Sequence, residues 1–478
     1  GDLRDLGVES DSQTRDPSGR QGSHQDDVRS AILLLLILIL AGILRIHGIG
    51  DQSLWFDESA TVRIVRQGFG EMFGSIREGE RIPPLHYLIL WVWVRVFGHA
   101  DWSVRLPSAL AGTAAVWVLY LLTRRLFGAG AALAAALLLA VAPFQVDYSQ
   151  EARSYSLLLL LSLLSCDLFV RILREPKPRG EAAYVLVSAA ALYSHLYAVF
   201  TFIAQAIAYA LAWTRPDKPL LRPRRWVVTQ IGIIALFLWW VPTAIRWTKS
   251  VGAGFWLPPA SGDDLWAAYL TYAGGSIATV LLLAVLLVIG VAEARRRNVI
   301  GLALMFSLAT LPVFLPVIAS ILTKPTFTPR YGIVAPAALY ALVGCGVIAL
   351  RNRAAQGIVV AALVALSFNA MAWMSVNPDW RGAVAHLDRV ARRGDYVVMT
   401  PRLSTYLWDR YATRTDYRRK GFDAGAIPLS VPLADGVTVW FVYEPAIYPA
   451  NSILARGGWQ IRSSRRFEGL IVLELDDG

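Results

Sequence analysis

The stretch Ala31-Ile-Leu-Leu-Leu-Leu-Ile-Leu-Ile-Leu-Ala-Gly-Ile-Leu-Arg-Ile46 decides the fold, because it is apolar throughout except for one arginine near its end. A helix needs roughly 20 such residues to cross about 30 Å of hydrocarbon. Comparable runs lie at Leu106–Leu122, Gly130–Val146, Ser156–Leu173, Val227–Ile245, Ser276–Ala292, Val299–Leu322, Gly332–Leu350 and Gly357–Ser375. The sequence therefore predicts a mainly α-helical, polytopic membrane protein.

The composition points the same way. Hydrophobic residues make up 55% of the 478 and charged residues 17%, whereas about a quarter of a soluble domain is charged. Cys166 and Cys345 both fall inside apolar runs, where we expect them to act as small apolar residues rather than as metal ligands or a disulfide. The net charge of +11 comes from short loops between the runs, which indicates topology and contact with anionic lipid headgroups, not nucleic acid.

Positive charge predicts which loops face the cytoplasm. The basic loops are Thr123–Arg125, Arg171–Arg179, Arg215–Arg225, Ala294–Asn298 and Arg351–Arg353. Placing all of them inside requires two short passes within Tyr184–Trp213, turning near His195. It also lays Leu85–Phe97, which is too short to span, along the outer interface as an amphipathic or re-entrant helix. The prediction is about 11 spans in the cytoplasmic (inner) membrane, with the amino terminus inside and the carboxyl terminus outside.

The two ends of the chain differ from the middle. Residues 1–29 are polar and lack apolar periodicity, which predicts a disordered cytoplasmic tail before a retained first helix. Residues 30–375 form the predicted transmembrane catalytic module. Residues 376–478 are predicted to form a small extracytoplasmic α/β domain, with a helix after Pro378 and strands at Asp395–Met399, Val437–Val442 and Leu470–Leu475.

This topology gathers the unusual polar residues on one side. Asp57 and Glu58 fall in the first outer loop, where an acidic pair beside lipid is costly unless it does chemistry or meets a cation. The segments Tyr148–Tyr155, Ser194–Tyr197 and Lys324–Tyr331 fall in later outer turns. We therefore predict a single site at the outer membrane face.

The residue types limit the chemistry of that site. A carboxylate such as Asp57 can take a proton from a hydroxyl while the oxygen attacks. The cations Arg81, Arg153, Lys324 and Arg330 can stabilise negative charge, and phosphate is the obvious anion at a headgroup boundary. The pattern predicts transfer of a group from a lipid phosphate to a hydroxyl, with the phosphate leaving into the cationic cluster.

Six short motifs carry a family resemblance across about residues 50–335. They are Trp55–Glu58, Pro83–Tyr87, Val104–Ser108, Gln150–Tyr155, Tyr193–Tyr197 and Arg330-Tyr331. Through them the chain resembles the membrane-embedded glycosyltransferases of the GT-C class, specifically the bacterial family related to protein O-mannosyltransferases and lipid A aminoarabinose transferases. The resemblance implies a polyprenyl-phosphate sugar donor, an inverting transfer outside the cytoplasmic membrane, an acidic base in the first outer loop, and membrane-parallel helices there.

Residue by residue, the resemblance makes Asp57 the general base and Glu58 its neighbour, both catalytic. The expected substrate-binding residues are Gln150, Glu151, Arg153, Tyr155, His195, Tyr197, Arg81, His86, Lys324, Arg330 and Tyr331. One position departs from the family. The aminoarabinose transferases have a phosphate-contacting lysine before the Pro-Pro pair, where this chain has Ile82. Arg81, Lys324 or Arg330 would have to take its place.

Simpler interpretations stand beside these. Asp57 could cap the following helix, and Glu151 could pair with Arg153 at a helix end. His195 could hydrogen-bond a freed backbone carbonyl between two short passes. Arg330 could anchor the chain at the interface without touching phosphate.

Two other functions fit a membrane protein of this kind. A transporter or flippase of lipid-linked sugars is one, although the paired halves typical of transporters are not evident. A lipid-diphosphate-dependent polymerase or ligase is the other. Asp57, Glu58 and Glu151 could gather a divalent cation, but Lys324 and Arg330 supply positive charge, so we predict no metal. The sequence names neither the sugar nor the acceptor, which could be a protein, a lipid or a polysaccharide.

Overall fold

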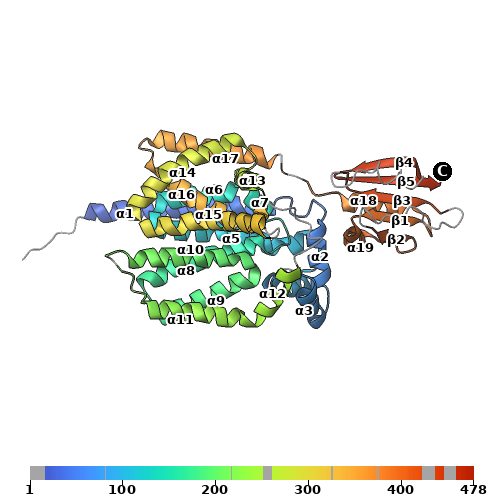
Figure 1. Ribbon diagram of the computed structural model, residues 1–478. Coiled ribbons are helices and arrows are strands. Elements are labelled where there is room, and N and C mark those ends of the chain that lie inside the picture. Colours follow the sequence, from blue (N-terminus) through green and yellow to red (C-terminus); the bar gives the residue numbers. More distant parts are fainter. Residues whose placement is uncertain are drawn as a thin grey trace, which may run out of the picture.

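The computed structural model describes residues 17–80, 82–216, 218–250, 261–323, 327–372, 374, 376–422, 437–445 and 459–477. The long helices are α1 (Pro17–Ile46), α5 (Asp101–Phe127), α6 (Ala129–Val141), α8 (Tyr155–Arg174), α9 (Pro178–Ser194), α10 (Val199–Trp213), α11 (Pro223–Phe237), α14 (Ile277–Arg297), α15 (Val299–Leu322), α16 (Val334–Ala349) and α17 (Arg353–Met371). Shorter ones are α2 (Phe56–Val65), α3 (Phe69–Glu78), α4 (Leu85–Phe97), α7 (Pro143–Asp147), η1 (Leu196–Ala198), η2 (Leu238–Trp240), α12 (Val241–Ser250), α13 (Asp263–Tyr272) and η3 (Pro329–Gly332). Figure 1 shows α2, α3, α7 and α13 at the end of the bundle nearest the carboxyl-terminal domain, which we call the domain end.

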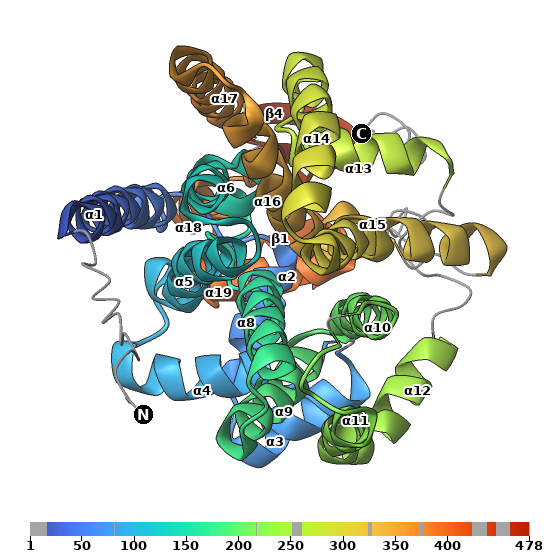
Figure 2. The same ribbon diagram turned by 90° about the vertical axis from the view of Figure 1, so that its left-hand side faces the viewer.

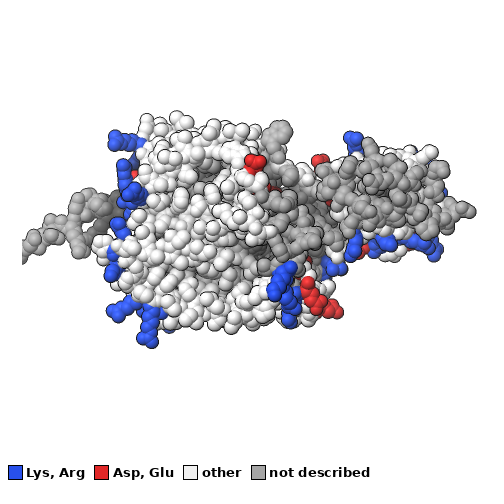
Figure 3. Space-filling model, viewed as in Figure 1, with Lys and Arg blue, Asp and Glu red and all other residues white. Residues whose placement is uncertain are grey.

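Eight helices of the described chain are long and apolar enough to cross a membrane. They are Asp27–Ile46, Asp101–Phe127, Tyr155–Arg174, Leu196–Trp213, Pro223–Trp247, Ile277–Arg297, Val299–Leu322 and Arg353–Met371. Figure 3 shows Lys and Arg along one edge of the bundle, and then a broad uncharged belt reaching to the elements beside the carboxyl-terminal domain. The expected multi-pass membrane protein is confirmed. The remaining predicted passes fall on α6, α9 and α16, which are helical but shorter, so about 11 spans stays a prediction.

The first helix begins earlier than the sequence indicates. Residues 17–29, which we expected to lie in a disordered tail, continue α1 on its amino-terminal side, and Asp27 pairs with Arg124 at 2.8 Å. Once the apolar run has nucleated a helix, each added residue costs little, so polar residues can extend it. Residues 1–16 lie outside the described part of the chain.

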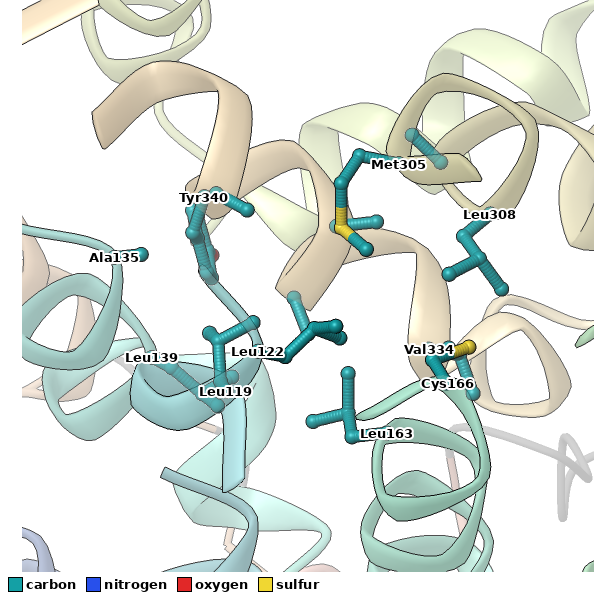
Figure 4. Close-up of a cluster of buried hydrophobic side chains, with 14 of the residues drawn as sticks. Leu119, Leu122, Ala135, Leu139, Leu163, Cys166, Met305, Leu308, Val334 and Tyr340 are labelled. Carbon is teal, nitrogen blue, oxygen red and sulfur yellow. The ribbon is translucent and has the colours of Figure 1, made fainter. Parts of the chain in front are cut away.

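The bundle core is formed where α5, α6, α8, α15 and α16 meet (Figure 4). Helices α14 and α16 cross with their backbones in contact at two glycines. A Cβ atom at Gly290 would lie 2.0 Å from the Leu342 carbonyl oxygen, and one at Gly346 would lie 2.0 Å from that of Leu286. Small residues at a crossing are typical of helix pairs in membranes, where close backbone approach replaces the hydrophobic driving force.

A proline break in α6 creates the turn that carries part of the site. Helix α6 ends at Val141 and the chain restarts at Pro143 as α7. The buried Arg45 donates hydrogen bonds to the carbonyl oxygens of Leu139 (3.0 Å) and Ala140 (2.9 Å), which the break leaves without helical partners. The chain can therefore leave the helix at this point and turn back as residues 148–154.

The helix predicted to lie along the interface forms over the predicted residues, Leu85–Phe97. Figure 2 shows that α4 runs across the direction of the bundle helices. Arg95 at its end donates to the carbonyl oxygens of Val65 (3.2 Å) and Gln67 (2.9 Å) and stacks on Trp91 at 3.5 Å. Helix α4 thereby holds the end of α2, the helix that carries the acidic pair.

The carboxyl-terminal domain contains the expected small sheet. In the part that the structure describes, its strands are β1 (Tyr396–Thr400), β2 (Arg418–Gly421), β3 (Val439–Tyr443), β4 (Trp459–Phe467) and β5 (Leu470–Asp477), in the order β2-β1-β3-β5-β4. Strand β1 pairs in parallel with β2 and β3, and β5 pairs antiparallel with β3 and β4. Helices α18 (Trp380–Val390) and α19 (Thr405–Tyr411) complete the described domain.

Asp101, at the start of α5, fastens this domain to the bundle. Its carboxylate accepts from Arg381 Nη2 (2.6 Å), Arg410 Nη2 (2.7 Å) and Tyr411 Oη (2.7 Å). Leu54 N donates to the Tyr411 hydroxyl oxygen at 2.7 Å, which ties the segment before α2 to the same cluster. The domain therefore rests against the loop that leads into the acidic pair.

Candidate active site

Asp57 lies in the first turn of α2, at the domain end, with its side chain 22% exposed. Its Oδ2 atom is 3.6 Å from Arg330 Nη2 and 3.8 Å from Arg153 Nη2. Charge-assisted hydrogen bonds are shorter, about 2.7–2.9 Å. Two guanidinium groups from distant parts of the chain therefore hold the carboxylate electrostatically, and its oxygens remain open to a further partner.

Glu58 lies next to Asp57 in sequence but is completely buried. Its Oε1 accepts from Arg105 Nε (2.8 Å) and Ala152 N (2.8 Å), and its Oε2 accepts from Arg105 Nη2 (2.7 Å) and Trp55 N (3.2 Å). These bonds join α2, α5 and the 148–154 turn. Both carboxylate oxygens are thus engaged within the protein, which suits a positioning role; the catalytic role expected for Glu58 stays a prediction.

Arg105 is a residue that sequence reasoning did not select for the site, although it lies in the motif Val104–Ser108. Besides Glu58, it donates to the carbonyl oxygens of Ile49, Gln52 and Ser53, each at 3.0 Å. One guanidinium thus fixes the whole segment that connects α1 to α2. Such a buried ion pair is tolerable only when further hydrogen bonds satisfy it, as they do here.

Arg153 contacts α2 from the 148–154 turn. Its Nη1 donates to the Asp57 carbonyl oxygen (3.3 Å) and to Thr61 Oγ1 (3.0 Å). Burial opposes its charge, but Asp57 and neighbouring groups outweigh this and hold the pKa of Arg153 above its usual value. Its buried Nε has no hydrogen-bond partner among the described residues, which leaves one donor of this guanidinium unused.

Arg330, in η3, is surrounded by aromatic rings. Its guanidinium carbon lies 5.2 Å from the ring centroid of Trp55 and 5.9 Å from those of Tyr155 and Tyr331. Electron-rich ring faces stabilise a cation without supplying a counter-charge. Arg330 is therefore held in place while its charge stays directed at Asp57.

The aromatic residues expected at the site form one cluster beside Arg330. The Tyr331 ring lies 5.0 Å from that of His195, 5.2 Å from Tyr197 and 6.3 Å from Tyr155. His195 is buried at the junction of α9 and η1, where its Nδ1 accepts from Tyr197 N at 3.2 Å. It thus satisfies a freed backbone N–H, which differs from the carbonyl contact that the simpler interpretation expected.

Glu151 lies beside a second carboxyl group, Asp147. No ion pair joins Glu151 to Arg153 among the described residues, and the buried Oε2 atom of Glu151 has no described hydrogen-bond partner. Burial, followed by the nearby Glu58 and Asp147, raises the pKa of Glu151 well above its usual range. Burial and Glu58 raise the pKa of Asp147 to about 6. Asp57 is thus held by Arg153 and Arg330, whereas at Glu151 burial and the neighbouring carboxyl groups outweigh the effect of these two arginines.

Two of the expected substrate-binding residues, Gln150 and His86, hydrogen-bond to the backbone. Gln150 Nε2 donates to the carbonyl oxygens of Leu44 (3.1 Å) and His47 (2.8 Å), at the end of α1. The buried His86 contacts the Ala152 carbonyl oxygen through Nε2 at 3.1 Å. Burial and Arg153 lower the pKa of His86 to about 4, so its ring is neutral and Nε2 is the donor.

The remaining predictions concern phosphate and metal binding. Arg81 and Lys324 lie outside the described residues, and Ile82 is buried in the core beneath α2 and α4. Among the described residues, no group of three or more His, Cys, Asp and Glu side chains is arranged to hold a metal ion. Arg153 and Arg330 are the predicted cations that the structure brings to Asp57.

Comparison with known proteins agrees with the fold. Residues 81–241 match the family described as dolichyl-phosphate-mannose-protein mannosyltransferase. A putative mannosyltransferase of Bacillus subtilis, YycA, is 31% identical over 155 residues, or 30% of this chain and 22% of the relative. The match therefore spans about a fifth of that relative's length.

Solved structures match over nearly the whole chain. ArnT from Cupriavidus metallidurans in the apo state is 14% identical, with a TM-score of 0.57 over 95% of this chain and 98% of ArnT. ArnT bound to undecaprenyl phosphate gives a TM-score of 0.56 at 14% identity, over 92% and 97% of the two chains. The GT-C resemblance that the motifs indicated is confirmed, and the fold is a GT-C bundle with a small carboxyl-terminal sheet domain.

Proposed function

We propose that this chain, a multi-pass membrane protein with the GT-C fold, is an inverting glycosyltransferase. It would move a sugar from a polyprenyl phosphate to a hydroxyl acceptor at the outer face of the cytoplasmic membrane. One observation carries the proposal: the Asp57 carboxylate lies between Arg153 and Arg330, at 3.8 and 3.6 Å, with part of its surface exposed. A carboxylate able to act as a base and two cations able to bind phosphate therefore lie together beside the membrane-spanning helices.

The reaction follows from that arrangement. Asp57 takes the proton of the acceptor hydroxyl as its oxygen bonds to C1 of the sugar. The bond between C1 and the phosphate oxygen breaks with its electron pair on the phosphate, and attack from the opposite side inverts C1. The departing polyprenyl phosphate gains one negative charge. Arg330 and Arg153 are positioned to stabilise that charge in a site largely removed from water.

The surrounding residues position these groups. Glu58 and Arg105 fix the first turn of α2, and His86 holds the 148–154 turn through Ala152. Gln150 anchors the same turn to the end of α1. Glu151, with an unused buried oxygen and a raised pKa, is suited to donate a hydrogen bond to a sugar oxygen while protonated. Because two arginines supply the positive charge, the proposed reaction uses no metal.

The comparisons support the class of reaction. The matching family is described by its use of a phosphate-linked mannose, and one of the similar structures is ArnT bound to undecaprenyl phosphate. Both point to a lipid-linked sugar as donor.

The test uses the purified full-length chain with defined polyprenyl-phosphate sugars and native envelope membranes as the source of acceptor. We expect the wild type to release polyprenyl phosphate, with or without EDTA. Asp57→Asn should lower that rate by about 10²–10⁴-fold while undecaprenyl phosphate still binds. The matched control is Asp51→Asn, an exposed aspartate of the same loop. Unchanged release by Asp57→Asn contradicts the base assignment, and lipid movement across vesicles without release would favour a flippase.

A further inference from the structure

A groove of about 300 Å³ lies at the end of the bundle opposite the domain end, which we call the basic end. Its walls come from the last turns of α5, α8 and α10 and the first turns of α15, and they include Leu126, Phe169, Leu173, Ile300, Gly301 and Leu304. Two cations, Arg174 and Lys218, also line it. We propose that this groove binds an anionic phospholipid, with an acyl chain against the apolar walls and the phosphate at the two cations.

The groove and the candidate active site lie at opposite ends of the same helices. Tyr155, which begins α8, has its ring 5.9 Å from the guanidinium carbon of Arg330. The groove residues of α8, Phe169 to Arg174, come 14 to 19 residues later, which is roughly 20–30 Å at 1.5 Å per residue. Figure 3 shows lysine and arginine side chains along this edge of the bundle. A lipid bound here is therefore distinct from the sugar donor, whose phosphate would meet Arg330.

The two cations of the groove are exposed, and no described carboxylate neutralises them. The buried Asp167, earlier on α8, pairs instead with Arg125 and Arg171, each at 2.7 Å. In the part of the chain that the structure describes, no ion pair joins Arg174 or Lys218 to an acidic side chain. The groove therefore carries two positive charges that an anionic ligand can balance.

The segment that carries Lys218 is fastened to the helix ends. Leu220 N donates to the Leu173 carbonyl oxygen at 3.0 Å, which joins this segment to the last turn of α8. The Lys218 ammonium lies 5.4 Å from the ring centroid of Trp213, the last residue of α10. A ring face stabilises a cation without supplying a counter-charge. The Lys218 charge is therefore held beside the groove and stays available to a ligand.

The rest of the lining favours a lipid over a soluble anion. Asn298, the third polar side chain, caps α15, since its Oδ1 accepts from Gly301 N at 2.9 Å. The remaining lining side chains are apolar, so a free phosphate would meet hydrocarbon on most sides. The cytoplasmic leaflet, which the basic end is predicted to face, carries anionic lipids, and basic pockets between membrane helices bind their headgroups. A zwitterionic headgroup would leave the two cations unbalanced.

The test measures binding of phosphatidylglycerol to the purified full-length chain by native mass spectrometry. We expect the wild type to retain phosphatidylglycerol in preference to phosphatidylethanolamine. The double variant Arg174→Gln, Lys218→Gln should bind phosphatidylglycerol about 30-fold more weakly, because each cation beside a lipid surface contributes about a factor of five. The matched control is Arg351→Gln, Arg353→Gln, which removes the same charge from exposed arginines outside the groove lining and should bind like the wild type.

A charge-preserving variant keeps the test independent of folding. Arg174→Lys, Lys218→Arg retains both charges and should retain most of the binding, and equal thermal midpoints without added lipid show that the variants are folded. Equal losses in the two glutamine variants would mean that overall charge, rather than the groove, attracts the lipid, and would overturn the proposal.

Two results with the wild type would also overturn it. Equal retention of phosphatidylethanolamine and phosphatidylglycerol would show that the cations do not select an anionic headgroup. Displacement of phosphatidylglycerol by an equal concentration of sodium phosphate would show an anion site that does not use the acyl chain. Either result leaves the proposed function untouched, because the groove lies at the other end of α8 from Tyr155 and Arg330.

Discussion

Glu58 and Arg105 form a bidentate ion pair, with Nε to Oε1 at 2.8 Å and Nη2 to Oε2 at 2.7 Å, and neither side chain is more than 3% exposed. The pair joins the first turn of α2 to α5, and its two residues are 47 positions apart in the chain. Because Asp57 is the preceding residue, its position depends on this pair. Of the two adjacent carboxylates, Asp57 therefore faces the arginines of the site, and Glu58 holds the first turn of α2 in position.

The first prediction concerns Glu58→Gln. Removing the charge leaves Arg105 buried without its partner, which typically costs about 3–5 kcal/mol of unfolding free energy. We expect a clearly lower thermal midpoint in detergent, and lower transfer as a consequence. Glu71→Gln, an exposed glutamate on the neighbouring α3, is the control and should change neither. A Glu58→Gln protein that is as stable as wild type but inactive would instead return Glu58 to the catalytic role.

The second prediction concerns Arg330. If its guanidinium stabilises the leaving phosphate, Arg330→Ala should lower kcat about 10²–10³-fold, as the loss of a transition-state donor does elsewhere. Arg330→Lys should recover only part of the rate, because lysine keeps the charge but loses the planar stacking on the rings. The matched control is Arg66→Ala, an exposed arginine at the end of α2. Steady-state release of polyprenyl phosphate measures the effect, and an unchanged kcat with only a raised KM would restrict Arg330 to donor binding.

The third prediction is a pH dependence of stability that originates in His86. Burial, and then Arg153, lower its pKa from 6.5 to about 4. Between these values the unfolded chain binds a proton that the folded protein does not, so unfolding free energy falls as pH falls from 6.5 to 4. The loss across this window is on the order of 3 kcal/mol. The raised pKa of Asp147 acts in the opposite direction, since its extra proton is held by the folded state.

A His86→Gln variant separates the two contributions. Glutamine can still donate to the Ala152 carbonyl oxygen but does not titrate. Thermal midpoints measured from pH 7.5 to 4 should fall less steeply for His86→Gln than for wild type, while the Asp147 contribution is common to both. Parallel curves for the two proteins would show that His86 is not the titrating group.

Much of the bundle could be predicted because apolar runs report helices directly. The helix Leu85–Phe97 has the predicted bounds. It could be distinguished from a membrane span because its apolar run is too short to cross the bilayer. The contacts of Gln150 and His86 could not be predicted, because both donate to carbonyl oxygens whose positions only the folded backbone sets. The motif Val104–Ser108 singled out the segment that contains Arg105. Its hydrogen bonds to Glu58 could not be predicted, because they form only when the fold brings α5 beside α2.

The carboxyl-terminal sheet shows the same limit. Strands β1, β3 and β5 were found from apolar residues, and these strands form the middle of the sheet. The edge strands β2 and β4 were missed. They read Arg-Arg-Lys-Gly and Trp-Gln-Ile-Arg-Ser-Ser-Arg-Arg-Phe, and most of their residues are exposed. Charged residues on an edge strand discourage its pairing with other chains. Such strands therefore carry few apolar residues, and the apolar pattern from which strands are predicted is absent from them.

The last prediction concerns the crossing of α14 and α16. A methyl group at Gly290 would lie 2.0 Å from the Leu342 carbonyl oxygen, so Gly290→Ala must push the two helices apart. We expect a loss of about 1–3 kcal/mol from overpacking, seen as a lower thermal midpoint. Gly357→Ala is the matched control, because the same change on α17 meets nothing within 4 Å and an added methyl should favour the helix by up to about 1 kcal/mol. An unchanged thermal midpoint for Gly290→Ala would show that the two helices can separate at this crossing without cost.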